Sequence, residues 1–284
     1  FCVHLRGTPR APGSLVIPSP SAGHRPAAYC QAIQGLKGKL DGRGFTILRE
    51  EPFVVVGDGA PDDVHKRSQG TIRWAVDHLR AAYFDQDPQA LNTIWLFEGE
   101  RSYTKHTREF FGAEPDTPYG YYSRAHAALI MNIATGGGTL VHELVHPFIE
   151  SNFPACPSWF DEGLASLYEQ CAERDGAIWG LTNWRLAGLQ QAIRAGRVPS
   201  FKALCGTTSD QFYDDDPGTN YAQARYLCYW LQERGLLRRY YRSFCDRHRE
   251  DPGGHAILQE TVGAPDMRAW QREWERFVLG LRFA

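Results

Sequence analysis

The most constraining feature of this sequence is a pair of histidines that lie one helical turn apart within an apolar stretch. His142 and His146 enclose the residues Glu143, Leu144 and Val145. In an α-helix, residues i and i+4 lie on one face, so the two imidazoles would point in the same direction. A mostly apolar helix is buried, and buried polar groups need partners. Two imidazoles at this spacing can share a metal ion as that partner.

A candidate third ligand, Glu162, follows His146 after 15 intervening residues and a proline-containing turn. Catalytic zinc sites take three protein ligands and leave a further position open. The small residues Gly163 and Ala165 beside this glutamate would let two helices approach closely at the metal. We therefore predict one Zn²⁺ per chain, bound by His142, His146 and Glu162.

The two motifs, HELVH at 142–146 and WFDEGLA at 159–165, together resemble those of gluzincin zinc metallopeptidases. The second motif is similar to the WxxEGxA pattern of the aminopeptidase N-like branch and of related bacterial peptidases. This resemblance implies a zinc-dependent hydrolase of peptide bonds in which Glu143 is the general base. It also implies an oxyanion-stabilising group in a later helix, for which Tyr221 is the candidate. The substrate that it implies is a peptide or protein.

The same resemblance implies a zincin-like α+β fold. We expect a small mixed-sheet N-terminal lobe followed by an all-helical C-terminal lobe, with the metal site between them. The expected division is an extended Pro/Gly-rich arm and lead-in at 1–40, an αβ lobe at 41–150 and a helical lobe at 151–284. In this fold an edge strand lies along the cleft, and the strand at 127–133 has the matching place in the sequence.

Hydrophobic periodicity and turn residues predict the individual elements. Strands are expected at 45–48, 53–56, 91–97 and 127–133. Helices are expected at 62–84, 103–111, 139–149, 158–171, 181–195, 220–233, 236–248 and 266–280. Thr219 or Asn220 is the expected N-cap of the helix at 220–233.

Two details modify the comparison with gluzincins. Pro147 directly follows His146, and proline removes a helical N–H group and disfavours helical dihedrals in the residue before it. We therefore expect the helix to kink or end just beyond the second histidine. Met131 is followed directly by Asn132, without an acidic residue between the methionine and the asparagine. The motif that recognises a free N-terminus is therefore missing, and we infer no aminopeptidase.

Several alternatives remain open at this stage. The same ligands would serve a zinc hydrolase of a non-peptide amide or ester, or a catalytically silent peptide-binding module with the same fold. Asp161 and Glu169 can orient a ligand imidazole, although acids on a helix surface are the expected interpretation. A disulfide between Cys156 and Cys171 would hold the segment that carries Glu162.

Composition excludes other classes of function. The formal net charge of −2 gives no support for a nucleic-acid partner, which normally requires a strongly basic face. Apolar runs fall short of the roughly 20 residues that span a bilayer, so no membrane span is expected. The first residue, Phe1, fits either a removed signal peptide or a trimmed chain, and a secreted or periplasmic location is favoured slightly.

Overall fold

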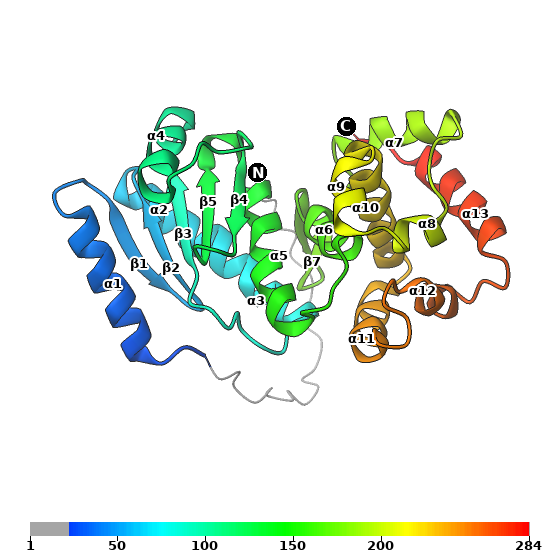
Figure 1. Ribbon diagram of the computed structural model, residues 1–284, viewed down its shortest axis with the longest axis horizontal. Coiled ribbons are helices and arrows are strands. Elements are labelled where there is room, and N and C mark those ends of the chain that lie inside the picture. Colours follow the sequence, from blue (N-terminus) through cyan, green and yellow to red (C-terminus); the bar gives the residue numbers. More distant parts are fainter. Residues whose placement is uncertain (1–22, 284) are drawn as a thin grey trace.

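The computed structural model describes residues 23–283, so the first 22 residues of the arm and lead-in expected at 1–40, including Cys2, lie outside the described residues. Its N-terminal half is built on a five-stranded mixed sheet of order β1-β2-β3-β5-β4 (Figure 1). The strands are β1 (Thr46–Glu50), β2 (Phe53–Gly57), β3 (Thr93–Phe97), β4 (Gly120–Ser123) and β5 (Ala128–Asn132). The three central strands are parallel, whereas β1 and β4 pair antiparallel at the two edges.

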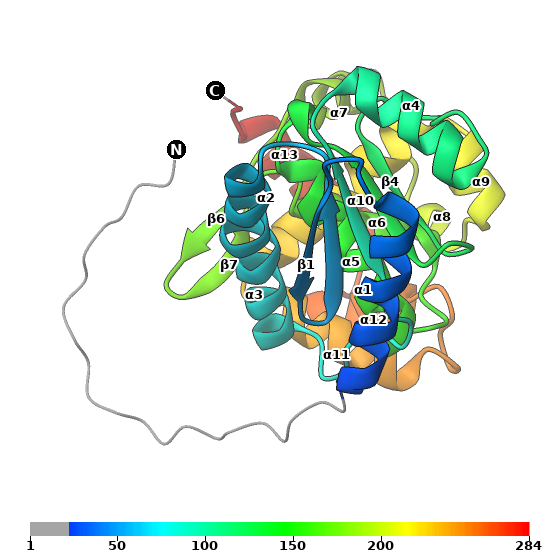
Figure 2. The same ribbon diagram turned by 90° about the vertical axis from the view of Figure 1, so that its left-hand side faces the viewer.

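Helices cover both faces of this sheet because side chains alternate between the faces along each strand. Val54 and Trp95 belong to a core cluster shared with α1 (Pro26–Leu40) and α4 (Glu100–Phe111). Val55 and Ile94 belong to a second, larger cluster on the opposite face. That face is covered by α2 (Pro61–Arg67), a π-helical turn (Ser68–Arg73), α3 (Trp74–Ala82) and α5 (Gly138–Asn152). Figure 2 shows the sheet edge-on between α1 and the α2–α3 segment.

The C-terminal half consists mainly of helices, which lie beyond α5 in Figure 1. They are α6 (Ser158–Leu167), α7 (Arg185–Arg194), α8 (Phe201–Cys205), α9 (Ser209–Asp214), α10 (Pro217–Glu233), α11 (Leu237–Arg247), α12 (His255–Val262) and α13 (Met267–Gly280). Buried residues from both halves join in the larger core cluster. Among the described residues, no helix has the length and apolarity that crossing a bilayer requires.

The structure confirms the α+β class, with a small mixed sheet in the N-terminal half and helices in the C-terminal half. Three expectations about elements are wrong. Residues 26–40 form a helix, α1, rather than an extended lead-in. The rear half is not all helical, because β6 (Cys171–Arg174) and β7 (Ala177–Gly180) form a hairpin where the helix at 158–171 was expected to end. The strand at 127–133, now β5, pairs on both sides, so the edge strand is β4.

Helix boundaries also differ from expectation at several points. The helix at 220–233 begins at Pro217, and its N-cap is Asp216, whose carboxylate accepts from the Thr219 backbone N–H. Neither Thr219 nor Asn220 is therefore the cap. The short helices α8, α9 and α12 were not predicted, because five to eight residues carry too little periodicity to detect.

Candidate metal centre

Helix α5 carries both histidines and does not end at the proline. It runs from Gly138 to Asn152 with Pro147 inside it, so of the two expected outcomes, a kink or an end just beyond His146, the end does not occur. The physical reason is tertiary packing, since Val145 and Phe148 on either side of the proline are fully buried in the core. Burial of this kind overrides the local preference of a proline-containing segment.

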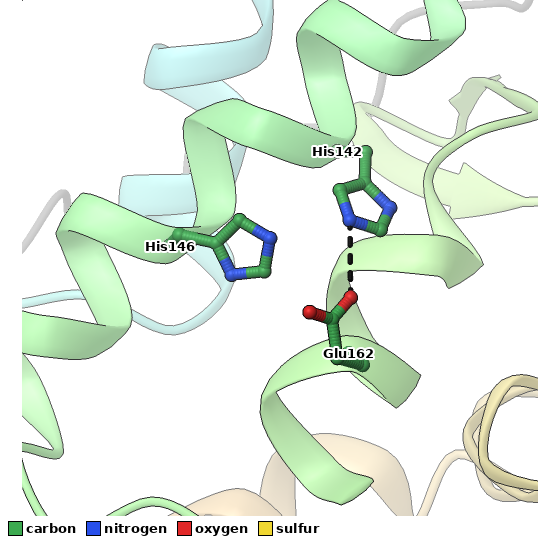
Figure 3. A group of neighbouring side chains, drawn as sticks. All are labelled: His142, His146 and Glu162. Atoms are coloured by element: carbon green, nitrogen blue, oxygen red, sulfur yellow. Dashed lines mark ion pairs between the residues drawn. The ribbon is translucent and has the colours of Figure 1, made fainter. Parts of the chain in front are cut away.

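Glu162 reaches the two histidines from the second helix, α6. Figure 3 shows His142 and His146 extending from one helix toward the Glu162 carboxylate on the other. His142 Nε2 lies 3.2 Å from Glu162 Oε2. One ligand atom from each of the three residues lies within 4.8 Å of the others, and all three side chains are buried. The structure thus brings the three predicted ligands into one group that can hold a metal ion.

The general-base candidate faces the same group. Glu143 is buried, and its Oε2 lies 3.8 Å from Nε2 of His146. Burial raises the pKa of Glu143, an effect that the neighbouring imidazoles oppose. A carboxyl group with a raised pKa holds a proton more readily than an exposed one, which is the property that a proton carrier near neutral pH requires.

Asp161 orients the second histidine. Its Oδ1 accepts a hydrogen bond from Nδ1 of His146 at 2.8 Å, when that nitrogen is protonated, and both side chains are buried. The bond leaves Nε2 of His146 to face the metal group. The expectation that Asp161 is an acid on a helix surface is therefore wrong, and its contact is of the kind that fixes a ligating imidazole.

Glu169 occupies the corresponding place beside the first histidine. Its Oε1 lies 3.4 Å from Nδ1 of His142, although the two atoms lack the alignment of a hydrogen bond. Arg185 binds Glu169 through two hydrogen bonds of 2.7 and 2.9 Å, and the Asn183 amide donates a third at 2.9 Å. Glu169 is therefore held firmly beside His142 and is not a solvated surface acid.

Close backbone contacts explain two glycines near the site. A Cβ atom on Gly138 would lie 2.0 Å from the Glu169 carbonyl oxygen, so the first turn of α5 can meet the turn that follows α6 only at glycine. A Cβ on Gly163 would lie 3.1 Å from the backbone of Ala224 in α10. The small residue beside Glu162 therefore permits close packing of α6 against α10. The sequence had suggested instead that two helices approach each other closely at the metal.

The charges of the site favour a cation. Burial alone lowers the pKa of His146, but the carboxylates of Asp161 and Glu162 override burial and raise this pKa to about 9. The pKa of His142 is likewise raised well above its usual value, against burial, by Glu162 and Glu169. Burial raises the pKa of Glu162, but His146 and His142 outweigh it and bring the pKa to about 2. Without a metal, both imidazoles thus hold protons that balance the surrounding carboxylates.

Unpaired atoms and donor chemistry support the same conclusion. Among the described residues, Glu162 Oε2 and His142 Nδ1 are buried atoms without a hydrogen-bond partner. Buried polar groups are rarely left unpaired, and coordination of a cation would satisfy the Glu162 oxygen. Two imidazoles and one carboxylate also form a donor set that zinc takes in catalytic sites. The residues present therefore fit a divalent metal ion.

A cleft of about 2560 Å³ opens onto this group. The edge strand β4 contributes Tyr121 and Tyr122 to one wall, and the Tyr122 ring stacks beside His146 with 6.5 Å between ring centroids. Tyr213 and Tyr221 also line the cleft, and the Tyr213 hydroxyl donates to Glu162 Oε1 at 2.8 Å. Burial and the Glu162 carboxylate raise the pKa of Tyr221. The predicted Tyr221 therefore lies at the site, but the aromatic hydroxyl bonded to the ligand belongs to Tyr213.

Sequence reasoning missed Tyr213 and Arg185. Tyr213 lies 51 residues from Glu162, and Arg185 follows the hairpin that was not predicted, so no local spacing pointed to either. The link between Cys156 and Cys171, which the sequence left open, is not formed, since both are free thiols. Helix packing and the hydrogen bonds described above hold Glu162 in place without it.

Comparison with known protein families found no matching family model, and comparison with curated proteins found no match.

Proposed function

We propose that this chain is a zinc-dependent peptidase of gluzincin type, with His142, His146 and Glu162 as metal ligands. The observation that carries the proposal is the convergence of these three buried side chains with the carboxylate of Glu143 in an open cleft. When bound, a zinc ion lowers the pKa of a water molecule and polarises a carbonyl group.

Glu143 serves as the proton carrier in this proposal. Its carboxylate accepts a proton from the attacking water and passes that proton to the leaving amine. Asp161 holds the His146 imidazole in orientation through its hydrogen bond, and Glu169 places a negative charge beside His142. Tyr221 supplies a hydroxyl donor to the developing oxyanion, and loss of one such donor typically costs about 2.7–4 kcal/mol in the transition state.

The β4 strand supports a peptide substrate in particular. It ends the five-stranded sheet, and residues along its length line the cleft. An edge strand presents backbone N–H and C=O groups to which an extended peptide can add as a further strand. Zinc hydrolases of small amides or esters have no need of such an edge.

The test separates metal binding from catalysis. Glu143→Gln should retain zinc while peptide hydrolysis falls by about 10²–10⁴-fold, because the general base is lost. His142→Ala should lose both zinc and hydrolysis. Zinc content by elemental analysis and turnover of a quenched fluorescent peptide library measure the two properties. Full activity of Glu143→Gln would refute the proposed role, and a zinc-loaded wild type that binds peptides without cleaving them would favour a silent binding module.

A further inference from the structure

Exposed aromatic side chains gather in the cleft. Among residues 23–283, the large apolar side chains that remain exposed are Tyr119, Leu181, Trp184, Tyr213 and Phe283. Three of these, Tyr119, Trp184 and Tyr213, line the cleft that opens onto the metal group. Trp184 is the most exposed of all, at 61%. Apolar surface that is left open inside a cleft is typical of a ligand contact.

The Trp184 ring is connected to the metal group through two side chains. The guanidinium carbon of Arg185 lies 4.2 Å from the Trp184 ring centroid. Arg185 in turn is fixed by its two hydrogen bonds to Glu169, which lies 3.4 Å from His142. One face of the indole is thus held against an anchored cation. A ring that is already ordered loses little rotamer freedom when a ligand packs on it.

The stacked arginine also restricts what the free face of the ring can accept. Aromatic faces attract cations, but a second cation on Trp184 would meet the charge of Arg185 across the ring. A bulky apolar or aromatic side chain meets no such repulsion and buries the exposed indole surface. We propose that Trp184 is a specificity-determining residue that selects peptides with a bulky apolar side chain near the scissile bond. This inference rests on the proposed peptidase function.

Trp179 provides a matched control. Its ring is likewise stacked by an arginine, Arg174, at 4.7 Å, and its indole N–H donates to Glu233. Trp179 is not among the residues that line the cleft. Its partner Arg174 does line the cleft, so a change at Trp179 removes an arginine-stacked tryptophan of the same region while Trp184 and Arg185 stay in place.

The experiment compares peptides that differ at one position between Phe, Leu, Ala and Lys, using zinc-loaded protein. Wild type and Trp179→Ala should prefer Phe and Leu to Ala by roughly 10-fold or more in kcat/KM. Trp184→Ala should lose most of that preference, because the kcat/KM values of its Phe and Leu peptides should fall toward the value of its Ala peptide. An unchanged preference in Trp184→Ala, or a wild-type preference for Lys, would overturn the inference.

Binding of the same peptides to zinc-loaded Glu143→Gln, with and without Trp184→Ala, separates this inference from the proposed function. Tighter binding of Phe and Leu peptides that depends on Trp184 supports the inference even if the wild type hydrolyses nothing. Hydrolysis without side-chain preference supports the peptidase and refutes the role of Trp184. A Glu143→Gln protein that binds none of the peptides refutes the inference as well.

Discussion

The contact between Asp161 and His146 allows a quantitative prediction about metal affinity. The hydrogen bond is 2.8 Å long and buried, and its acceptor is a carboxylate. Hydrogen bonds to charged groups contribute about 1.5–3 kcal/mol, and loss of such a partner typically weakens metal binding about 10–100-fold. At about 1.4 kcal/mol per tenfold change, these two estimates agree. Asp161→Ala should therefore bind zinc about 10–100-fold more weakly than the wild type.

Asp161→Asn refines the prediction. The amide oxygen of asparagine can still accept from Nδ1 of His146, but the negative charge is lost. We expect its zinc affinity to fall between those of the wild type and Asp161→Ala. Competition with a chromophoric chelator measures all three dissociation constants under the same conditions.

Glu50→Gln is the control for a general loss of stability. Glu50 is also a buried carboxylate, but its partners are Ser68 and Arg73, at the far edge of the sheet. Its substitution should lower the thermal stability of the protein and leave zinc affinity unchanged. The reasoning is refuted if Asp161→Ala binds zinc as tightly as the wild type, or if Glu50→Gln weakens binding equally.

Two further predictions concern protons and packing. In the metal-free protein the pKa of His146 is about 9, raised above its ordinary value of 6.5. The protonated imidazole therefore stabilises the fold fully below about pH 6.5, and this stabilisation is lost as the pH rises through about 9. Urea unfolding should show this loss in metal-free protein, and zinc should bind more tightly over the same range as protons cease to compete. Gly138→Ala should destabilise the protein by about 1–3 kcal/mol, because its Cβ would collide with the Glu169 backbone. Gly35→Ala in α1, with open space around it, should instead stabilise by about 0.5–1 kcal/mol; equal effects of the two substitutions would contradict the packing argument.

The grouping of His142, His146 and Glu162 could be predicted from the sequence because the information for it is local. His142 and His146 share one helix turn, and Glu162 sits in a motif of its own. The residues that contact the two imidazoles depend on where separate helices meet, and tertiary packing decides where they meet. Whether Asp161 and Glu169 face the imidazoles or the solvent could not be deduced from helical spacing alone.

The elements that were not predicted differ in the strength of their sequence signals. Asp175 and Gly176 both have positive φ angles, the conformation of a type I′ hairpin turn, for which Asp-Gly is a strong sequence signal. That signal could have identified the β6–β7 hairpin. Pro26 at the first turn of α1 is likewise a helix-start signal, hidden by the prolines before it. In contrast, β4 is only four residues long, and its position at the edge follows from pairing with β5, which no local pattern reveals.

The central claim is that His142, His146 and Glu162 bind one metal ion, and metal content tests it most directly. Elemental analysis should be made on purified wild type and Glu162→Ala, after exposure to zinc and removal of the excess, with circular dichroism to verify folding. The account predicts about one zinc per wild-type chain and a large loss in the variant. A folded wild type that retains no zinc, or a Glu162→Ala protein that retains as much as the wild type, would contradict it.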